Sequence, residues 1–142
     1  MSDYPELVAR LRVEEGVKTS AYRDSRGILT IGVGFNIDGD HGGGLDDTEI
    51  DFILAHRIAL VADAAQRYPW FDGLSKERQM VVLDMMYNLG PEKFSLFHGT
   101  HHAIATGAWD QAALNMLNSL WARQVGKRAD RLARIMRTNV WE

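Results

Sequence analysis

The 142-residue sequence contains no cysteine. It therefore cannot form a disulfide, use a thiolate nucleophile, or bind zinc or an iron–sulfur cluster through cysteine. Long hydrophobic runs are also missing, because the longest apolar stretch is the five residues 58–62, too short to span a membrane. The N-terminal residues carry neither a basic cluster nor an apolar stretch, so we expect no signal peptide and no transmembrane segment.

Hydrophobic residues make up 46% and charged residues 25% of the chain, values typical of one soluble globular domain over residues 1–142. The net charge of −3 is unevenly distributed. Residues 1–71 contain 7 basic and 12 acidic side chains, whereas residues 72–142 contain 9 basic and 7 acidic ones.

The basic excess is concentrated near the C-terminus, where a single Asp130 accompanies six cations: Arg123, Lys127, Arg128, Arg131, Arg134 and Arg137. A basic helix can bind an anionic surface such as a cell envelope, or it can be an ordinary solvated helix face. Because no aromatic interleaving or groove-binding motif accompanies the cations, we expect no nucleic-acid partner.

The N-terminal third predicts a helix followed by a small hairpin. Pro5 suits a first helical turn, and apolar residues at helical spacing predict a helix that ends near Glu15. A short strand at about 20–23, a turn at 24–27 and an alternating strand at 28–33 follow. A glycine-rich loop then occupies residues 36–46.

The remainder is helical in pattern. We expect a long helix at about 47–67 with Asp46 or Asp47 as its cap, a helix from Ser75 to Gly90, and further helices near 94–106, 108–119, 119–124 and 126–137. This predicts a mainly helical α+β fold with a hairpin lobe at about 15–46. The helix at 47–67 connects it to a helical lobe, formed by residues 68–142 and the N-terminal helix. A site is expected in a cleft between the lobes.

Two carboxylates and a hydroxyl in the hairpin region suit glycoside hydrolysis. Glu15 ends the first helix, Asp24 lies in the open turn, and Thr30 lies on the following strand. One carboxyl group can donate a proton to the leaving oxygen, while the other acts on water or on the developing positive charge. A nearby hydroxyl can orient that water.

The order Glu15-Gly16, Asp24 and Thr30-Ile31-Gly32-Val33-Gly34 resembles the phage lysozyme family, glycoside hydrolase family 24. The phrase 22–32, Tyr-Arg-Asp-Ser-Arg-Gly-Ile-Leu-Thr-Ile-Gly, is similar to the family signature throughout. The resemblance continues through Met-Tyr-Asn-Leu-Gly at 86–90 and into the C-terminal helices at 109–113, Trp121 and 128–131.

The resemblance implies a lysozyme-like fold and a muramidase that cuts the β-1,4 bond between N-acetylmuramic acid and N-acetylglucosamine in peptidoglycan. It implies that Glu15 is the general acid, that Asp24 positions or activates water, and that Thr30 helps to bind this water in an inverting reaction. Helical periodicity alone leaves Glu14 and Glu15 both open, and the match to the family spacing favours Glu15. Glu14 is then a surface partner of Lys18 or Arg10.

The resemblance also implies six substrate contacts: Asn36, Tyr87, Asn88, Phe97, Thr100 and Asn115. Phe97 could equally be a core aromatic residue, and only the backbone position of Asn36 matches the family. Phe35 occupies a position where the family often carries a histidine with a structural role. We expect a monomer whose partner is peptidoglycan.

The loop resembles an EF-hand calcium site, in which oxygen ligands alternate and a glutamate closes the cage. Its candidate ligands are Asp38, Asp40, the Gly44 carbonyl, Asp46 and Glu49. One ligand position is occupied by Gly42, and the competing interpretation is a flexible loop whose acids cap the long helix. Catalysis itself is expected to need no cofactor.

A cluster of His98, His101 and His102 has a spacing that can bind zinc, but no glutamate lies between them as in a zinc protease. A zinc amidase is therefore less favoured than a surface cluster. A lytic transglycosylase and a non-catalytic wall-binding module are two further functions that the sequence leaves open. The phage-lysozyme resemblance implies an endolysin stored in the host cytoplasm and released into the periplasm through a holin pore.

Overall fold

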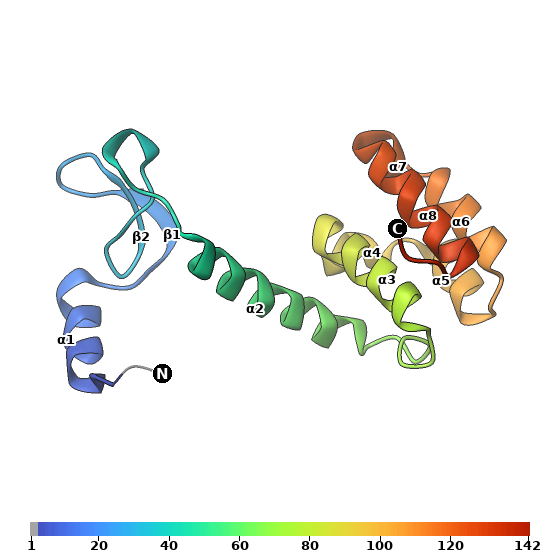
Figure 1. Ribbon diagram of the computed structural model, residues 1–142, viewed down its shortest axis with the longest axis horizontal. Helices are drawn as coiled ribbons and strands as arrows, with labels where there is room; N and C mark the ends of the chain where they lie inside the picture. Colours follow the sequence, from blue (N-terminus) through green and yellow to red (C-terminus); the bar gives the residue numbers. More distant parts are fainter. Residues whose placement is uncertain (1–2) are drawn as a thin grey trace. The chain divides into compact units, whose positions relative to one another are not determined.

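The structure, a computed structural model, describes residues 3–142 (Figure 1). The chain divides within its longest helix into two compact units, one ending at Phe52 and the other beginning at Ile53. Helices predominate, with one small antiparallel sheet, so the predicted α+β class is confirmed. No helix within residues 3–142 has both the length and the apolar character needed to cross a membrane.

The first unit contains the sheet. Its elements are α1 (Pro5–Glu15), β1 (Lys18–Arg23), β2 (Leu29–Gly32), β3 (Phe35–Asn36), the 3-10 helix η1 (Gly39–His41) and the beginning of α2 (Asp47–Ala65). The sheet order is β1-β2-β3, and both pairings are antiparallel. Thr30 on the central strand lies opposite Tyr22 on one side and Asn36 on the other.

The long helix begins with a reciprocal cap. The Asp46 side chain accepts the backbone N–H of Glu49 (2.8 Å), and the Glu49 carboxylate accepts the backbone N–H of Asp46 (2.8 Å). This capping box satisfies two backbone donors that a helix start otherwise leaves unpaired. Of the two predicted caps, Asp46 and Asp47, it is Asp46 that caps α2.

The second unit is helical. It contains the end of α2 and α3 (Lys76–Leu89), α4 (Pro91–Ser95), α5 (His98–Ala105), α6 (Trp109–Leu117), α7 (Leu120–Val125) and α8 (Lys127–Thr138). In Figure 1, α6 and α8 lie side by side. Methionines from α3 and α6 and the apolar face of α8 form a core in which Met85, Met116 and Leu132 are fully buried.

His101 on α5 is half-buried, whereas His98 and His102 are exposed. Its ring lies 4.6 Å from Tyr68 and 4.7 Å from Phe94, measured between ring centroids. His101 Nε2 lies 2.7 Å from the Phe94 carbonyl oxygen. Because a carbonyl only accepts, Nε2 carries the hydrogen of the neutral ring. Burial lowers the pKa of His101 below its ordinary value.

The free energy of unfolding of the helical unit should therefore be lower in weakly acidic than in neutral solution. The unfolded His101 has a pKa of about 6.5 and binds a proton that the folded residue resists. The stabilisation is complete above that pKa and decreases as the pH falls below it. Urea unfolding followed by tryptophan fluorescence reports on this unit, because Trp70, Trp109, Trp121 and Trp141 all lie in it.

We expect the free energy of unfolding to decrease from pH 7 to pH 5, and to decrease less in His101→Gln. His102→Gln, a change at an exposed neighbour, should retain the wild-type dependence. An equal pH dependence in wild type and His101→Gln would show that another group titrates.

Candidate active site

Glu15 lies at the C-terminal end of α1, and its side chain contacts the turn between β2 and β3. The contact lies at Gly34, where an added Cβ would lie 2.7 Å from Glu15 Oε2 and 3.0 Å from its Cδ. Gly34 also has a φ of +70°, which favours glycine. The turn therefore brings a backbone without a side chain against the candidate acid.

Glu14 has a different environment. Its Oε1 lies 3.8 Å from Arg10 Nε one helical turn earlier, and both side chains are exposed. This agrees with the predicted role of Glu14 as a surface partner of Arg10. An exposed pair of this kind contributes only a few tenths of a kcal/mol, about 0.3–0.5 kcal/mol.

Asp24 is held in the β1–β2 turn by backbone donors. Its Oδ1 accepts the N–H of Arg26 (2.8 Å) and the N–H of Ile28 (2.9 Å). The hydrogen bond from Ile28 is the main cause that lowers the pKa of Asp24 below its ordinary value. Asp24 is therefore an ionised carboxylate at neutral pH.

Thr30 is buried on β2, and its hydroxyl donates to the Ile28 carbonyl oxygen (2.9 Å). Because the hydroxyl hydrogen is used in this bond, Oγ1 presents its lone pairs and can accept a hydrogen bond from water. Ile28 thus binds both candidates, since its N–H binds Asp24 and its C=O binds Thr30. The structure thus links these two predicted residues through their hydrogen bonds to Ile28.

Asn36 uses its amide group within the loop. Its Oδ1 accepts the backbone N–H of Asp38 (2.9 Å), and its Nδ2 donates to the His41 carbonyl oxygen (3.1 Å). The loop leaves little room here, because a Cβ on Gly43 would lie 2.2 Å from Asn36 Oδ1. The side chain of Asn36 therefore organises the loop, and its backbone position remains the predicted contact.

The predicted calcium ligands form hydrogen bonds of their own. Asp38 accepts the backbone N–H groups of Leu29 and Asp40, at 3.1 Å each, and Asp46 and Glu49 form the capping box of α2. Within residues 3–142, no three His, Asp or Glu side chains are grouped so that they could hold a metal ion. As arranged, the loop does not fit a calcium cage.

Calcium binding by a rearranged loop stays a prediction. If it occurs, millimolar calcium will raise the melting temperature and a chelator will reverse the increase, because a ligand of the native state stabilises it. Equal melting temperatures with calcium and with chelator, measured by circular dichroism, would remove the calcium hypothesis.

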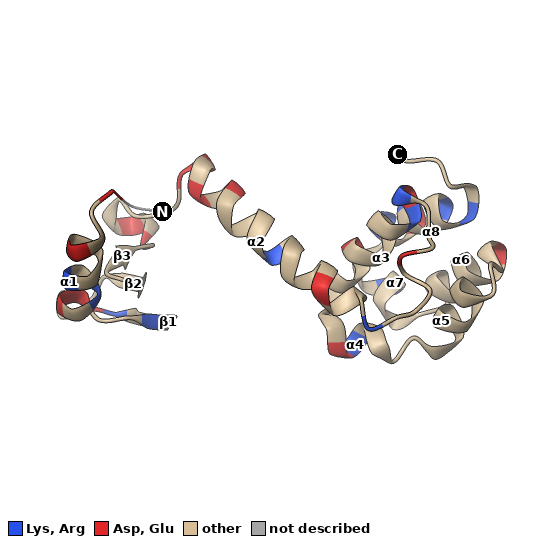
Figure 2. Cartoon of the chain, turned by 90° about the horizontal axis from the view of Figure 1, so that it is seen from below, with Lys and Arg blue, Asp and Glu red and all other residues tan. Residues whose placement is uncertain are grey.

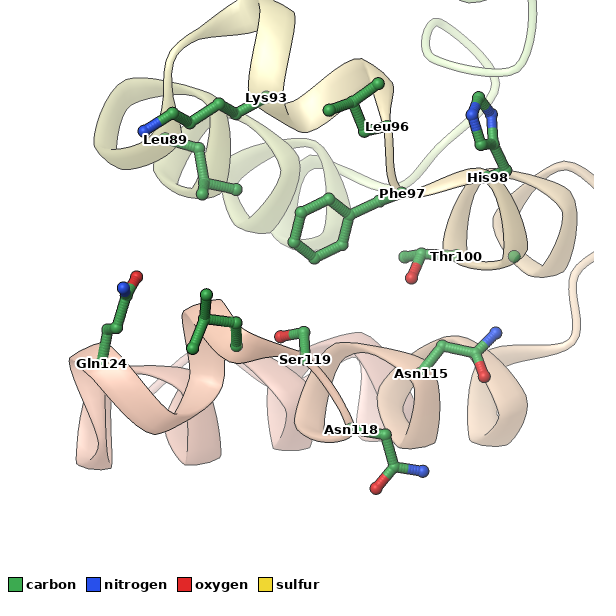
Figure 3. A pocket seen from close by; sticks show the side chains of 12 residues that line it. Leu89, Lys93, Leu96, Phe97, His98, Thr100, Asn115, Asn118, Ser119 and Gln124 are labelled. Atoms are coloured by element: carbon green, nitrogen blue, oxygen red, sulfur yellow. The ribbon is translucent and has the colours of Figure 1, made fainter.

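Three of the predicted substrate contacts lie together in the helical unit. Phe97, Thr100 and Asn115 line a hollow of about 700 Å³ between α5, α6 and α7. Figure 3 shows Phe97 and Thr100 on one wall and Asn115 and Ser119 on the other. The hollow combines apolar and polar lining groups, as sugar and peptide ligands require.

The two remaining predicted contacts of this unit lie elsewhere. Tyr87 lines a separate hollow of about 380 Å³ with Leu60 and Pro91. The Asn88 side-chain oxygen accepts a hydrogen bond from the indole N–H of the buried Trp121 (2.8 Å). Asn88 therefore has a structural partner in addition to any substrate.

The Asn88 bond gives a stability prediction. Asn88→Ala should lower the free energy of unfolding by about 1 kcal/mol, because the indole N–H loses its acceptor. Asn118→Ala, at an exposed asparagine outside α3, serves as the control. Urea unfolding of both variants measures the difference, and equal stabilities would contradict a contribution from this bond.

The basic C-terminal helix is partly neutralised (Figure 2). Arg128 Nη2 lies 2.6 Å from Asp84 Oδ1, and Arg131 Nη2 lies 3.5 Å from the second oxygen of the same carboxylate. Arg134 pairs with Glu142 at 2.8 Å. Three of the six predicted cations thus bind carboxylates of the chain itself.

Sequence reasoning missed two features of these sites. Asp38, predicted as a calcium ligand, also links the loop to β2 by accepting a hydrogen bond from the Leu29 N–H. His98 and Asn118 also line the larger hollow, although the sequence indicated His98 only as part of a histidine cluster and did not indicate Asn118 at all. The role of Asp38 could have been predicted, because aspartates in loops commonly accept hydrogen bonds from nearby backbone N–H groups.

The chain is similar to known proteins over most of its length. The family model described as phage lysozyme matches residues 12–138. Two similar proteins of Dictyostelium discoideum are named probable T4-type lysozyme 2, at 23% identity, and probable T4-type lysozyme 1, at 21% identity. Each alignment covers 90% of this chain and 91% of the relative. The chain therefore belongs to the phage lysozyme family.

Proposed function

We propose that the protein is a muramidase that hydrolyses the β-1,4 bond between N-acetylmuramic acid and N-acetylglucosamine in peptidoglycan, with inversion. The observation that carries the proposal is the arrangement around Ile28. Its N–H binds the ionised Asp24 and its C=O binds the Thr30 hydroxyl, so a carboxylate and a hydroxyl acceptor are oriented by the same residue.

In the proposed reaction, Glu15 donates a proton to the glycosidic oxygen as the bond from that oxygen to C1 breaks. A water bound by Asp24 and Thr30 attacks C1, and its proton passes to Asp24. The proton gained by Asp24 balances the one lost by Glu15, and exchange with solvent restores both groups. Direct attack by water from the opposite face inverts the configuration at C1.

A lytic transglycosylase is the competing enzyme class, because it uses one acid and forms an anhydro sugar without water. Asp24 and Thr30 favour hydrolysis, because in the proposed reaction both bind the attacking water. Mass spectrometry of digested peptidoglycan tests the choice. We expect reducing N-acetylmuramic acid ends, and anhydro ends would contradict hydrolysis.

A non-catalytic wall-binding module is the competing hypothesis from outside the enzymes. It would bind purified peptidoglycan without releasing soluble fragments. Release of fragments by the wild-type protein excludes this hypothesis, and binding alone would establish it.

We further propose that the protein acts as a phage endolysin, stored in the host cytoplasm and released into the periplasm through a holin pore. The family relationship supports this role. The cations of α8 could contact the anionic envelope, although Asp84 and Glu142 bind some of them. Coexpression with and without a holin tests the route, since lysis should require the pore.

A further inference from the structure

Asp38 is a buried carboxylate, 8% exposed, at the start of η1. Each of its oxygens accepts one backbone N–H, Oδ2 from Leu29 and Oδ1 from Asp40. Two side-chain nitrogens lie beside Oδ2, with His41 Nδ1 at 3.1 Å and the Arg23 guanidinium Nη1 at 3.8 Å. The loop thus provides a charged acceptor directed at the central strand β2.

The Leu29 N–H belongs to the same peptide group as the Ile28 carbonyl. That carbonyl accepts the Thr30 hydroxyl and the backbone N–H of Asp24, each at 2.9 Å. A peptide group is planar, so its N–H and C=O cannot reorient independently. Asp38 therefore accepts the N–H of this peptide group, while the Asp24 N–H and the Thr30 hydroxyl donate to its C=O.

We propose that Asp38 is a positioning residue for Asp24 and Thr30, acting through the Ile28–Leu29 peptide group. The inference rests on the proposed muramidase function. A carboxylate that accepts the N–H holds the orientation of the plane. It also polarises the peptide, so that the carbonyl becomes a stronger acceptor for Thr30 and Asp24.

The surroundings of Asp38 keep it charged. The hydrogen bond from Leu29 is the main cause that lowers the pKa of Asp38, and the bonds from Asp40 and His41 act in the same direction. The carboxylate therefore remains ionised at the neutral pH of an activity assay. Burial with these partners explains how the loop accommodates a negative charge.

The first test is an NMR measurement that does not depend on activity. In Asp38→Asn, the amide-proton resonances of Leu29 and Asp24 should both shift, because the two N–H groups belong to bonds that share one peptide plane. Asp47→Asn removes a carboxylate from an exposed position at the start of α2 and should leave both resonances in place. An unchanged Asp24 resonance in Asp38→Asn would overturn the coupling.

The second test separates positioning from binding. We expect Asp38→Asn to lower kcat about 10- to 100-fold on soluble peptidoglycan fragments, with KM unchanged, because small misplacements of reacting groups are costly. Asp38→Ser provides a second variant, since serine can still cap η1 but is too short to reach Leu29. It should show the same loss of kcat.

The outcomes distinguish this inference from the proposed function. A wild-type kcat in either folded variant, or a change confined to KM, would overturn the positioning role. If the wild-type protein itself released no reducing ends, the proposed function would fail, whereas the NMR result would still decide the coupling between Asp38 and Asp24.

Discussion

Glu15→Gln should abolish the clearing of outer-membrane-permeabilised Gram-negative cells. Glutamine has nearly the same shape but cannot donate the proton that the leaving oxygen needs. Loss of a general acid costs about 10²- to 10⁴-fold in rate. A turbidity assay measures the loss, and thermal unfolding should show that the variant folds like the wild type.

Glu14→Gln is the matched control, since it makes the same chemical change one residue earlier. Glu14 pairs with Arg10 at an exposed position, so activity and stability should remain near the wild-type values. Full activity in Glu15→Gln would show that the acid is misassigned. Loss of activity in Glu14→Gln alone would transfer the role to that residue.

Gly34→Ala should also reduce hydrolysis strongly. The added Cβ would lie 2.7 Å from Glu15 Oε2, so the carboxyl group must move away from its position. A displacement of about 1 Å can reduce activity about 10²-fold. The positive φ of Gly34 adds a stability cost of about 1 kcal/mol.

Gly42→Ala separates these two effects. Gly42 has a φ of +73°, close to that of Gly34, but nothing lies within 4 Å of an added Cβ. It should lose similar stability and keep its activity. Equal activity in the two variants, measured as reducing ends released from peptidoglycan, would contradict a functional contact between Gly34 and Glu15.

Strong local signals predicted most of the fold. Pro5 begins α1, Asp46 caps α2 and Ser75 caps α3, each as expected. The helix predicted at 94–106 was wrong in its boundaries, because the chain forms two helices, Pro91–Ser95 and His98–Ala105. Pro91 starts a new helix immediately after Gly90, whose φ of +88° ends α3.

The small strand β3 could not be predicted, because two residues have no detectable periodicity. Phe35 and Asn36 are extended through their pairing with Ile31 and Thr30, which is a tertiary effect. The first strand likewise begins at Lys18 rather than near residue 20.

The candidate site likewise has features that the sequence predicts and features that only the structure shows. The spacing of Glu15, Asp24 and Thr30 predicts a catalytic triad through its family resemblance, while the hydrogen bonds through Ile28 required the structure. For Asp38, alternating acids in the sequence predict calcium binding, which stays a prediction, whereas its hydrogen bonds from two backbone N–H groups became visible only in the structure. A sequence pattern of acidic residues does not reveal whether their oxygens bind a cation or accept hydrogen bonds from the backbone.

The most direct measurement follows the anomeric configuration of the first product by proton NMR during peptidoglycan hydrolysis. If Asp24 and Thr30 orient a water that attacks C1 directly, the α-anomer of the new reducing end will appear first and will mutarotate afterwards. Initial formation of the β-anomer would contradict direct attack by this water. An anhydro product would contradict hydrolysis altogether.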